Sequence, residues 1–139
     1  MFKIDLTELT PVEYFPGLSA EFPISSDSGA AATAVVYIEV APGGELPVHS
    51  DSAEELLLGL EGEVVASVGD ESGPLRAGEV AVVPAMVPHG LRNLGDRPAR
   101  VLGFFGGSPN VATFADAVFV VGGPRPIVVP LHEEAAVAG

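Results

Sequence analysis

The sequence predicts an all-β fold, a sandwich or barrel built from short strands. Glycine and proline are frequent, with 17 and 13 residues, and both are spread evenly along the chain. The apolar segments between them are short, and no segment between residues 30 and 106 sustains a helical period. Short apolar runs separated by turn residues are typical of β sandwiches and barrels.

Six segments in the middle of the chain have the length and apolar content of strands. Turn residues separate them at 42–44, 61–63, 69–73 and 93–96. A seventh segment, 50–55, has the length of a helical turn, and we interpret it as the entry to a strand. The six expected strands are 33–40, 54–60, 64–68, 80–83, 90–93 and 99–105.

Two arms flank this region. The N-terminal arm, 1–32, has apolar residues between prolines and predicts one or two short strands. The C-terminal arm, 106–139, carries apolar runs at 118–121 and 127–129 around a Gly-Gly-Pro-Arg-Pro turn. Such arms often cover an open sheet edge, of their own barrel or of a second subunit, so we expect a homodimer. His132 and the alanine-rich end, 135–139, are expected to be an exposed, frayed tail.

Length and charge limit the classes of function. The 139 residues suit one domain, with a barrel core at about 33–105 between the two arms. The net charge of −13 disfavours nucleic acid as a partner, and the absence of cysteine excludes thiolate ligands and thiol nucleophiles. No signal peptide and no apolar run of roughly 18 residues is visible. We therefore expect a soluble, cytoplasmic protein that binds a small molecule and has no membrane partner.

A first histidine signature begins at Gly43 and ends at Gly62. Between these glycines lie His49 and Asp51, followed by Glu55. Side chains alternate across a strand, so His49 and Asp51 project from the same face.

A second signature begins at Gly78 and ends at Asn93. It contains Pro84, Met86 and His89. Proline residues on both sides of Met86 end one strand and stiffen the approach to His89.

The two signatures together predict a metal site. If the faces carrying these residues look into a barrel, two imidazoles and up to two carboxylates converge on one point. Nitrogen and oxygen ligands suit Fe, Mn, Ni, Cu or Zn, with bonds of roughly 2.0–2.2 Å. The candidate metal ligands are His49, Asp51, Glu55 and His89.

A candidate substrate pocket lies on the same strand faces. Leu57 and Gly59 share a face with Glu55, and Leu91 shares one with His89. With Met86, these residues predict a largely apolar lining that suits an aromatic or otherwise hydrophobic small molecule. For Gly59, close packing or a bulge is an equal alternative to making room for a ligand.

With both signatures in register, the sequence resembles the cupin superfamily over roughly residues 33–105. The resemblance implies a jelly-roll β-barrel, also called a double-stranded β-helix. In that family the first motif usually supplies two histidines and a glutamate, and the second supplies one histidine. Matched position by position, His49, Glu55 and His89 fall on ligand positions.

Two departures from the family pattern affect the expected site. Met86 stands where the second motif usually has glycine, and Asp51 stands where the first usually has its second histidine. Asp51 can act as a direct ligand, through a water, or as a proton shuttle and hence a catalytic residue. Without Asp51, the family positions still leave a set of two histidines and one carboxylate. A polar cluster without metal is the alternative.

Three functions are compatible with these residues. The first is a mononuclear metal-dependent oxidoreductase, similar to the small dioxygenases of the superfamily. The second is a module that binds a small molecule, with or without metal, and performs no chemistry. The third is a metal-free acid–base isomerase that uses Asp51 and His89. The sequence leaves open whether the protein is an enzyme.

Overall fold

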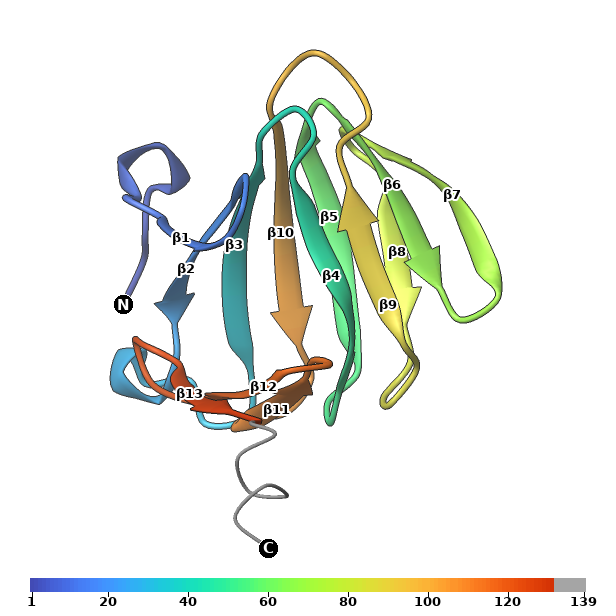
Figure 1. Ribbon diagram of the computed structural model, residues 1–139. Coiled ribbons are helices and arrows are strands. Elements are labelled where there is room, and N and C mark those ends of the chain that lie inside the picture. The colour runs from blue at the N-terminus through green and yellow to red at the C-terminus, as the bar shows by residue number, and fades with distance from the viewer. Residues whose placement is uncertain (132–139) are drawn as a thin grey trace, which may run out of the picture.

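The computed structural model describes residues 1–131 and has an all-β fold in which strands form two antiparallel sheets (Figure 1). Two short 3-10 helices, Leu6–Glu8 and Ser26–Ser28, lie in the N-terminal arm. The strands are β1 (Val12–Phe15), β2 (Leu18–Ile24), β3 (Ala34–Val40), β4 (Glu45–Asp51), β5 (Glu55–Glu61), β6 (Glu63–Val68), β7 (Glu71–Arg76), β8 (Val80–Val83), β9 (His89–Arg92), β10 (Ala99–Phe105), β11 (Asn110–Thr113), β12 (Ala117–Val121) and β13 (Ile127–Pro130).

The two sheets lie face to face and enclose the core. One sheet has the order β1-β2-β3-β10-β5-β8, and the other has the order β13-β12-β11-β4-β9-β6-β7. Inward-facing residues alternate with outward-facing ones along the central strands, as in β5, so one face of each sheet is apolar. The residues buried most completely between the sheets include Val40, Val64, Val83, Leu91 and Ala99.

All six predicted strands are present, with each end within one residue of its expected position. The expected turn at 69–73 is wrong in its second half, because the chain turns at Gly69-Asp70 and Glu71 already begins β7. Gly73 and Pro74 gave this segment the composition of a turn. They are tolerated in β7 because it is the outermost strand of its sheet, where a missing N–H breaks no interstrand bond.

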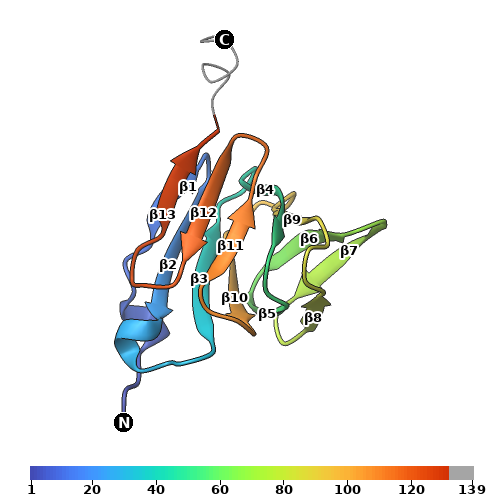
Figure 2. The same cartoon turned by 90° about the horizontal axis from the view of Figure 1, so that it is seen from below.

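Both arms continue the sheets of the barrel. β1 and β2 extend one sheet beyond β3, while β11, β12 and β13 extend the other beyond β4. Figure 2 shows β11, β12 and β13 in front of β1, β2 and β3, so the two arms face each other. Aromatic rings join them, with 5.0 Å between the ring centroids of Phe15 and Phe114. The arms therefore cover edges of their own barrel, and the homodimer stays a prediction.

Tight turns explain why the two signatures contain glycine. Gly43, Gly62 and Gly78 adopt positive φ angles of 79°, 67° and 85°, which a residue with a Cβ rarely adopts. These turns set the lengths of the strands that carry the histidines. Across residues 1–131, no helix has the length and apolar character needed to cross a membrane. His132 and residues 135–139 lie outside the described residues.

Candidate metal centre

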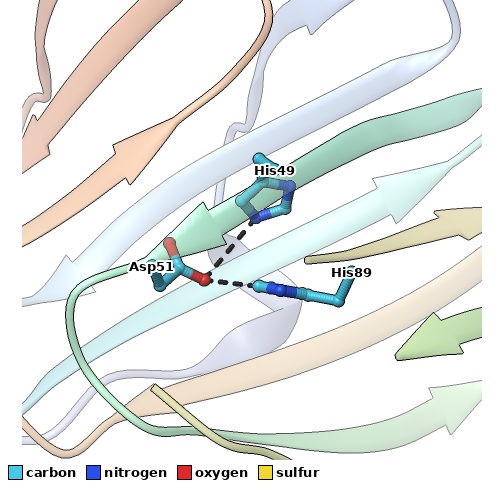
Figure 3. A group of neighbouring side chains, drawn as sticks. All are labelled: His49, Asp51 and His89. Carbon is cyan, nitrogen blue, oxygen red and sulfur yellow. Dashed lines mark ion pairs between the residues drawn. The ribbon is translucent and has the colours of Figure 1, made fainter. Parts of the chain in front are cut away.

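Two neighbouring strands bring the histidines together. β4 pairs with β9 so that His49 and His89 are direct cross-strand partners, and Asp51 lies two residues further along β4 on the same face. The Asp51 Oδ2 atom lies between the two imidazoles (Figure 3), 2.9 Å from His89 Nε2 and 3.6 Å from His49 Nε2. One ligand atom from each of these three residues lies within 4.8 Å of the others.

Backbone carbonyls orient both imidazoles. His49 Nδ1 donates to the carbonyl of Pro47 at 2.8 Å, and His89 Nδ1 donates to the carbonyl of Val87 at 2.9 Å. A proton on Nδ1 leaves the lone pair of the neutral ring on Nε2, which is the atom that faces Asp51. Metal-binding histidines usually donate their second ring nitrogen in this way.

The three residues fit a metal ion. Asp51 Oδ2 and His89 Nε2 are buried and have no hydrogen-bond partner, although buried polar atoms are nearly always paired. Their 2.9 Å separation is that of an ion pair, and its geometry is not that of an aligned hydrogen bond. Separations of 2.9 and 3.6 Å are those that bonds of about 2.0–2.2 Å to one ion produce at angles between about 90° and 120°.

The other side of the aspartate is held by the C-terminal arm. The Asn110 side chain is completely buried and donates from Nδ2 to Asp51 Oδ1 at 3.0 Å. Asn110 Oδ1 accepts from the backbone N–H of Ala53 at 3.0 Å. The backbone N–H of Met86 donates to the carbonyl of Asp51 at 2.7 Å, so the second signature also anchors the first. These contacts leave Oδ2 as the oxygen directed at the histidines.

Glu55 approaches from the opposite sheet. Its Oε1 lies 3.3 Å from His89 Nε2, and it is not one of the three residues whose ligand atoms converge. Gly103, on the neighbouring β10, makes room for it, because a Cβ at position 103 would clash with the Glu55 carboxylate. Burial raises the pKa of Glu55, and the nearby negative charge of Asp51 adds to this effect.

The charges around the centre favour a cation. Burial opposes ionisation of Asp51, but the adjacent imidazoles of His49 and His89 outweigh it and hold the pKa of that carboxyl well below its usual range. Burial also disfavours a charged His89, yet Asp51 and Glu55 raise the pKa of His89 to about 10. Both shifts show that a positive charge is stabilised next to Asp51.

A largely apolar cavity adjoins His49 and Asp51. It has about 60 Å³ of room for the centres of water molecules, whereas one water needs roughly 10–15 Å³. Its polar end contains His49, Asp51, Glu55 and Asn110. Its remaining walls are Tyr14, Phe15, Leu18, Ala20, Phe22, Val36, Ile38, Leu46, Phe105, Ala112, Phe114, Phe119 and Val121.

The residues predicted to line the pocket lie elsewhere. Leu57 and Leu91 point inward as expected but fill the core, with 2% and 1% of their surface exposed. Gly59 packs directly against the backbone of Arg76, which is the close-packing alternative. Met86 is 63% exposed in a surface turn. The apolar character of the pocket agrees with the expectation, while its residues come largely from the two arms.

Sequence reasoning missed Asn110 and the aromatic wall. Asn110 is 59 residues from Asp51 in the chain, and a single asparagine before a short apolar run carries no metal-site signal. Phe114, whose ring stacks on His49 at a centroid distance of 4.4 Å, is equally isolated in the sequence. The one available hint is the presence of aromatic residues at 14, 15 and 22 between prolines.

Comparison with known proteins identifies the family. Residues 36–105, half of the chain, match the family described as "Cupin domain". The chain is a cupin. The strands that carry His49, Asp51 and His89, β4 and β9, lie within the matched residues, whereas both arms lie outside them.

This cupin resembles proteins of several activities. It is 37% identical over 59 residues to a 3-hydroxyanthranilate 3,4-dioxygenase of Xanthomonas euvesicatoria pv. vesicatoria (strain 85-10), an alignment that covers 40% of this chain and 34% of the relative. A crystal structure of a sugar phosphate isomerase of Silicibacter pomeroyi DSS-3 has a TM-score of 0.69 at 20% identity, covering 95% of this chain and 98% of that chain. An oxalate oxidase with the substrate analogue glycolate has a TM-score of 0.72 at 21% identity, covering 82% and 63%. These structures share the fold, and the chain spans about a third of the dioxygenase's length.

Proposed function

We propose that this cupin holds one divalent transition-metal ion on His49, Asp51 and His89 and acts as an oxidoreductase on a small apolar or aromatic molecule. The observation that carries the proposal is the pair of buried atoms without hydrogen-bond partners, Asp51 Oδ2 and His89 Nε2. With His49 they make a set of two histidines and one carboxylate, a donor set that leaves coordination positions open.

Some side chains would bind the ion, and others orient the residues that bind it. Each imidazole donates from Nδ1 to a backbone carbonyl, which directs its Nε2 atom toward the ion. Asn110 fixes the Asp51 carboxylate so that Oδ2 serves as a ligand, which favours the direct-ligand role of Asp51 over a shuttle. A bound ion of this kind supplies Lewis-acid chemistry and, for Fe, Mn or Cu, redox chemistry. The aromatic walls exclude water and bury the apolar part of the substrate.

The dioxygenase relative favours an oxidoreductase over an isomerase. Its aligned segment is 37% identical to this chain, whereas the sugar phosphate isomerase is 20% identical. The apolar cavity also provides little for a sugar phosphate, since its polar groups are confined to the metal end. The structural neighbours below 25% identity support the fold alone. The alternative is a module that binds a small molecule without turnover. Oxygen consumption, measured after the metal content, distinguishes this alternative from the proposal.

The test is elemental analysis of the purified full chain, expressed with each of the five candidate metals. We expect about one transition-metal ion per chain, lost in His49→Ala and His89→Ala. Glu54→Gln is the matched control, because Glu54 is exposed beside the buried Glu55. Equal metal content in all variants, or none in the native chain, would overturn the metal centre.

Oxygen consumption by the metal-loaded protein with a panel of aromatic substrates then tests the reaction class. Saturable binding without oxygen uptake would assign the protein to the binding modules.

The single-domain organisation of residues 1–139 and the homodimer also stay proposals. Limited proteolysis tests the first, and analytical ultracentrifugation tests the second.

A further inference from the structure

The aromatic wall of the cavity is built by the two arms. β1 has a bulge between Glu13 and Phe15, and consecutive rings of Tyr14 and Phe15 both line the cavity as a result. Across from them, Phe114 and Phe119 come from the C-terminal arm. The Tyr14–Phe119 and Phe15–Phe119 ring centroids are each 5.9 Å apart, so the rings form one continuous wall.

This wall reaches the metal ligands directly. The Phe114 ring stacks on the His49 imidazole with 4.4 Å between centroids and 18° between planes. Phe114 therefore places an aromatic surface beside the ligand atoms. A planar ligand can lie against such a surface with its polar substituent at the metal end.

A second, larger hollow lies on the outer side of the same wall. This outer groove has about 630 Å³ of room for water centres, against about 60 Å³ inside. Tyr14, Ala20 and Phe22 line both spaces, so these residues alone are common to the two. The Tyr14 and Phe22 rings meet edge to face at a centroid distance of 6.3 Å and 72°. Ala20, the third shared residue, offers only a methyl group, so the two rings are the bulky side chains that separate the hollows.

Charge is distributed unequally across this wall. The inner cavity holds two carboxylates, Asp51 and Glu55. The outer groove contains Arg125, and it also holds Glu21 and Asp27. Among the described residues, no lysine or arginine lines the inner cavity. An anion that crosses this apolar wall would lose its hydration and find no lysine or arginine there to pair with, whereas an uncharged ring loses little on desolvation.

We propose that Tyr14 and Phe22 form the entrance through which a small, uncharged aromatic ligand passes from the outer groove to the His49–Asp51–His89 centre. The proposal rests on the proposed function, since it assigns the substrate class and the access route of the same site. Tyr14 and Phe22 are then specificity-determining residues, and both lie in the N-terminal arm outside the family match.

The first test is ligand charge, measured by ¹⁹F NMR titration with 4-fluorophenol and 4-fluorobenzoate. Both probes carry one fluorinated ring of similar size, and they differ in charge at neutral pH. We expect saturable binding of 4-fluorophenol and binding of 4-fluorobenzoate that is at least about tenfold weaker. Equal affinity for the two probes, or no binding of 4-fluorophenol, would overturn the assigned ligand class.

The second test is the rate of exchange of 4-fluorophenol in entrance variants. Tyr14→Ala and Phe22→Ala should raise the association and dissociation rates together by several-fold, because the barrier falls for both directions. Phe22→Trp should slow both rates, a change that loss of folding cannot imitate. Val12→Ala is the control, since Val12 lines the outer groove only. Rates unchanged by all three entrance variants, or raised equally by the control, would refute the entrance.

Metal content measured on the same samples separates the two proposals. Absence of metal together with the expected exchange pattern would refute the proposed function and leave the entrance standing. A full complement of metal without 4-fluorophenol binding would refute the entrance and leave the metal centre standing.

Discussion

At the scale of single residues, the orientation of Asp51 depends on one side chain, that of Asn110. Replacing Asn110 by alanine leaves Asp51 Oδ1 and the N–H of Ala53 buried without their partners. We expect a loss of about 1–3 kcal/mol in the free energy of unfolding and a metal affinity lower by about 10–100-fold. Urea denaturation and competitive metal titration measure the two effects.

Thr113→Ala is the matched control, because Thr113 is an exposed residue on the same strand, β11. If Asn110→Ala lowers stability and leaves metal affinity at the level of this control, Asn110 has a structural role alone.

The pKa of His89 predicts how the metal-free protein responds to pH. The pKa is about 10 in the folded chain against about 6.5 for an unperturbed histidine. The folded state therefore holds this proton more tightly, and the stabilisation is complete below about pH 6.5 and is lost as the pH rises toward 10. Urea denaturation of chelator-treated protein between pH 6 and 9.5 should show falling stability. If NMR shows that the His89 ring titrates with a midpoint near pH 6.5, the prediction is contradicted.

The sequence could predict that His49, Asp51 and His89 lie together because strand geometry is local. Alternation alone places His49 and Asp51 on one face, and the spacing in the second signature supplies His89. The role of Asn110 could not be predicted, since the contact joins residues 59 positions apart. Leu57 and Leu91 show a related limit. Alternation correctly turns them inward, but it cannot say whether an inward side chain lines a cavity or fills the core.

At the scale of elements, the turn between β8 and β9 shows why the family pattern favours glycine at position 86. Met86 has a φ of 68°, in the left-handed region that a side chain disfavours by about 1–2 kcal/mol. The turn persists because the Met86 N–H donates to the carbonyl of Asp51. Met86 is exposed, so its side chain contributes little packing that a substitution would lose.

We therefore expect Met86→Gly to raise the free energy of unfolding by about 1 kcal/mol, after the extra freedom of glycine in the unfolded chain is deducted. Met86→Ala is the control, because alanine keeps the same backbone strain and should leave stability nearly unchanged. Chemical denaturation of the three proteins measures the difference. Equal stabilisation by both substitutions would show that the exposed methionine side chain, and not the backbone, is the unfavourable feature.

Composition pointed to some elements, concealed others and gave no information on strand pairing. The apolar run at 118–121 lies within β12, whereas glycine and proline near position 73 gave β7 the composition of a turn. No local pattern indicates that β11 pairs with β4, because strand partners are chosen by the whole fold. That pairing is what brings Asn110 to Asp51.

At the scale of the whole molecule, the barrel and the arms make different parts of the site. The strands within the family match carry the three proposed metal ligands, and the arms outside it supply most of the cavity wall. A change in the arms can therefore alter which small molecules fit the cavity and leave the residues of the barrel site unchanged.

The metal centre should also stabilise the whole fold. Its ligands come from two strands of one sheet and face Glu55 of the other, so the site exists only when the barrel is closed. A ligand that binds the folded state alone adds about 2.7 kcal/mol of stability at a concentration of 100 times its Kd. We expect the Tm of chelator-treated protein to rise on addition of the cognate metal.

This measurement needs a control for charge, because the chain carries a net charge of −13 and any cation relieves its self-repulsion. Magnesium at the same concentration serves, since it prefers oxygen ligands and should not occupy a centre with two imidazoles. The rise in Tm should therefore exceed that caused by magnesium, and the excess should vanish in His89→Ala. An equal rise with both cations would mean that the stabilisation comes from screening of surface charge, and that folding is independent of the centre.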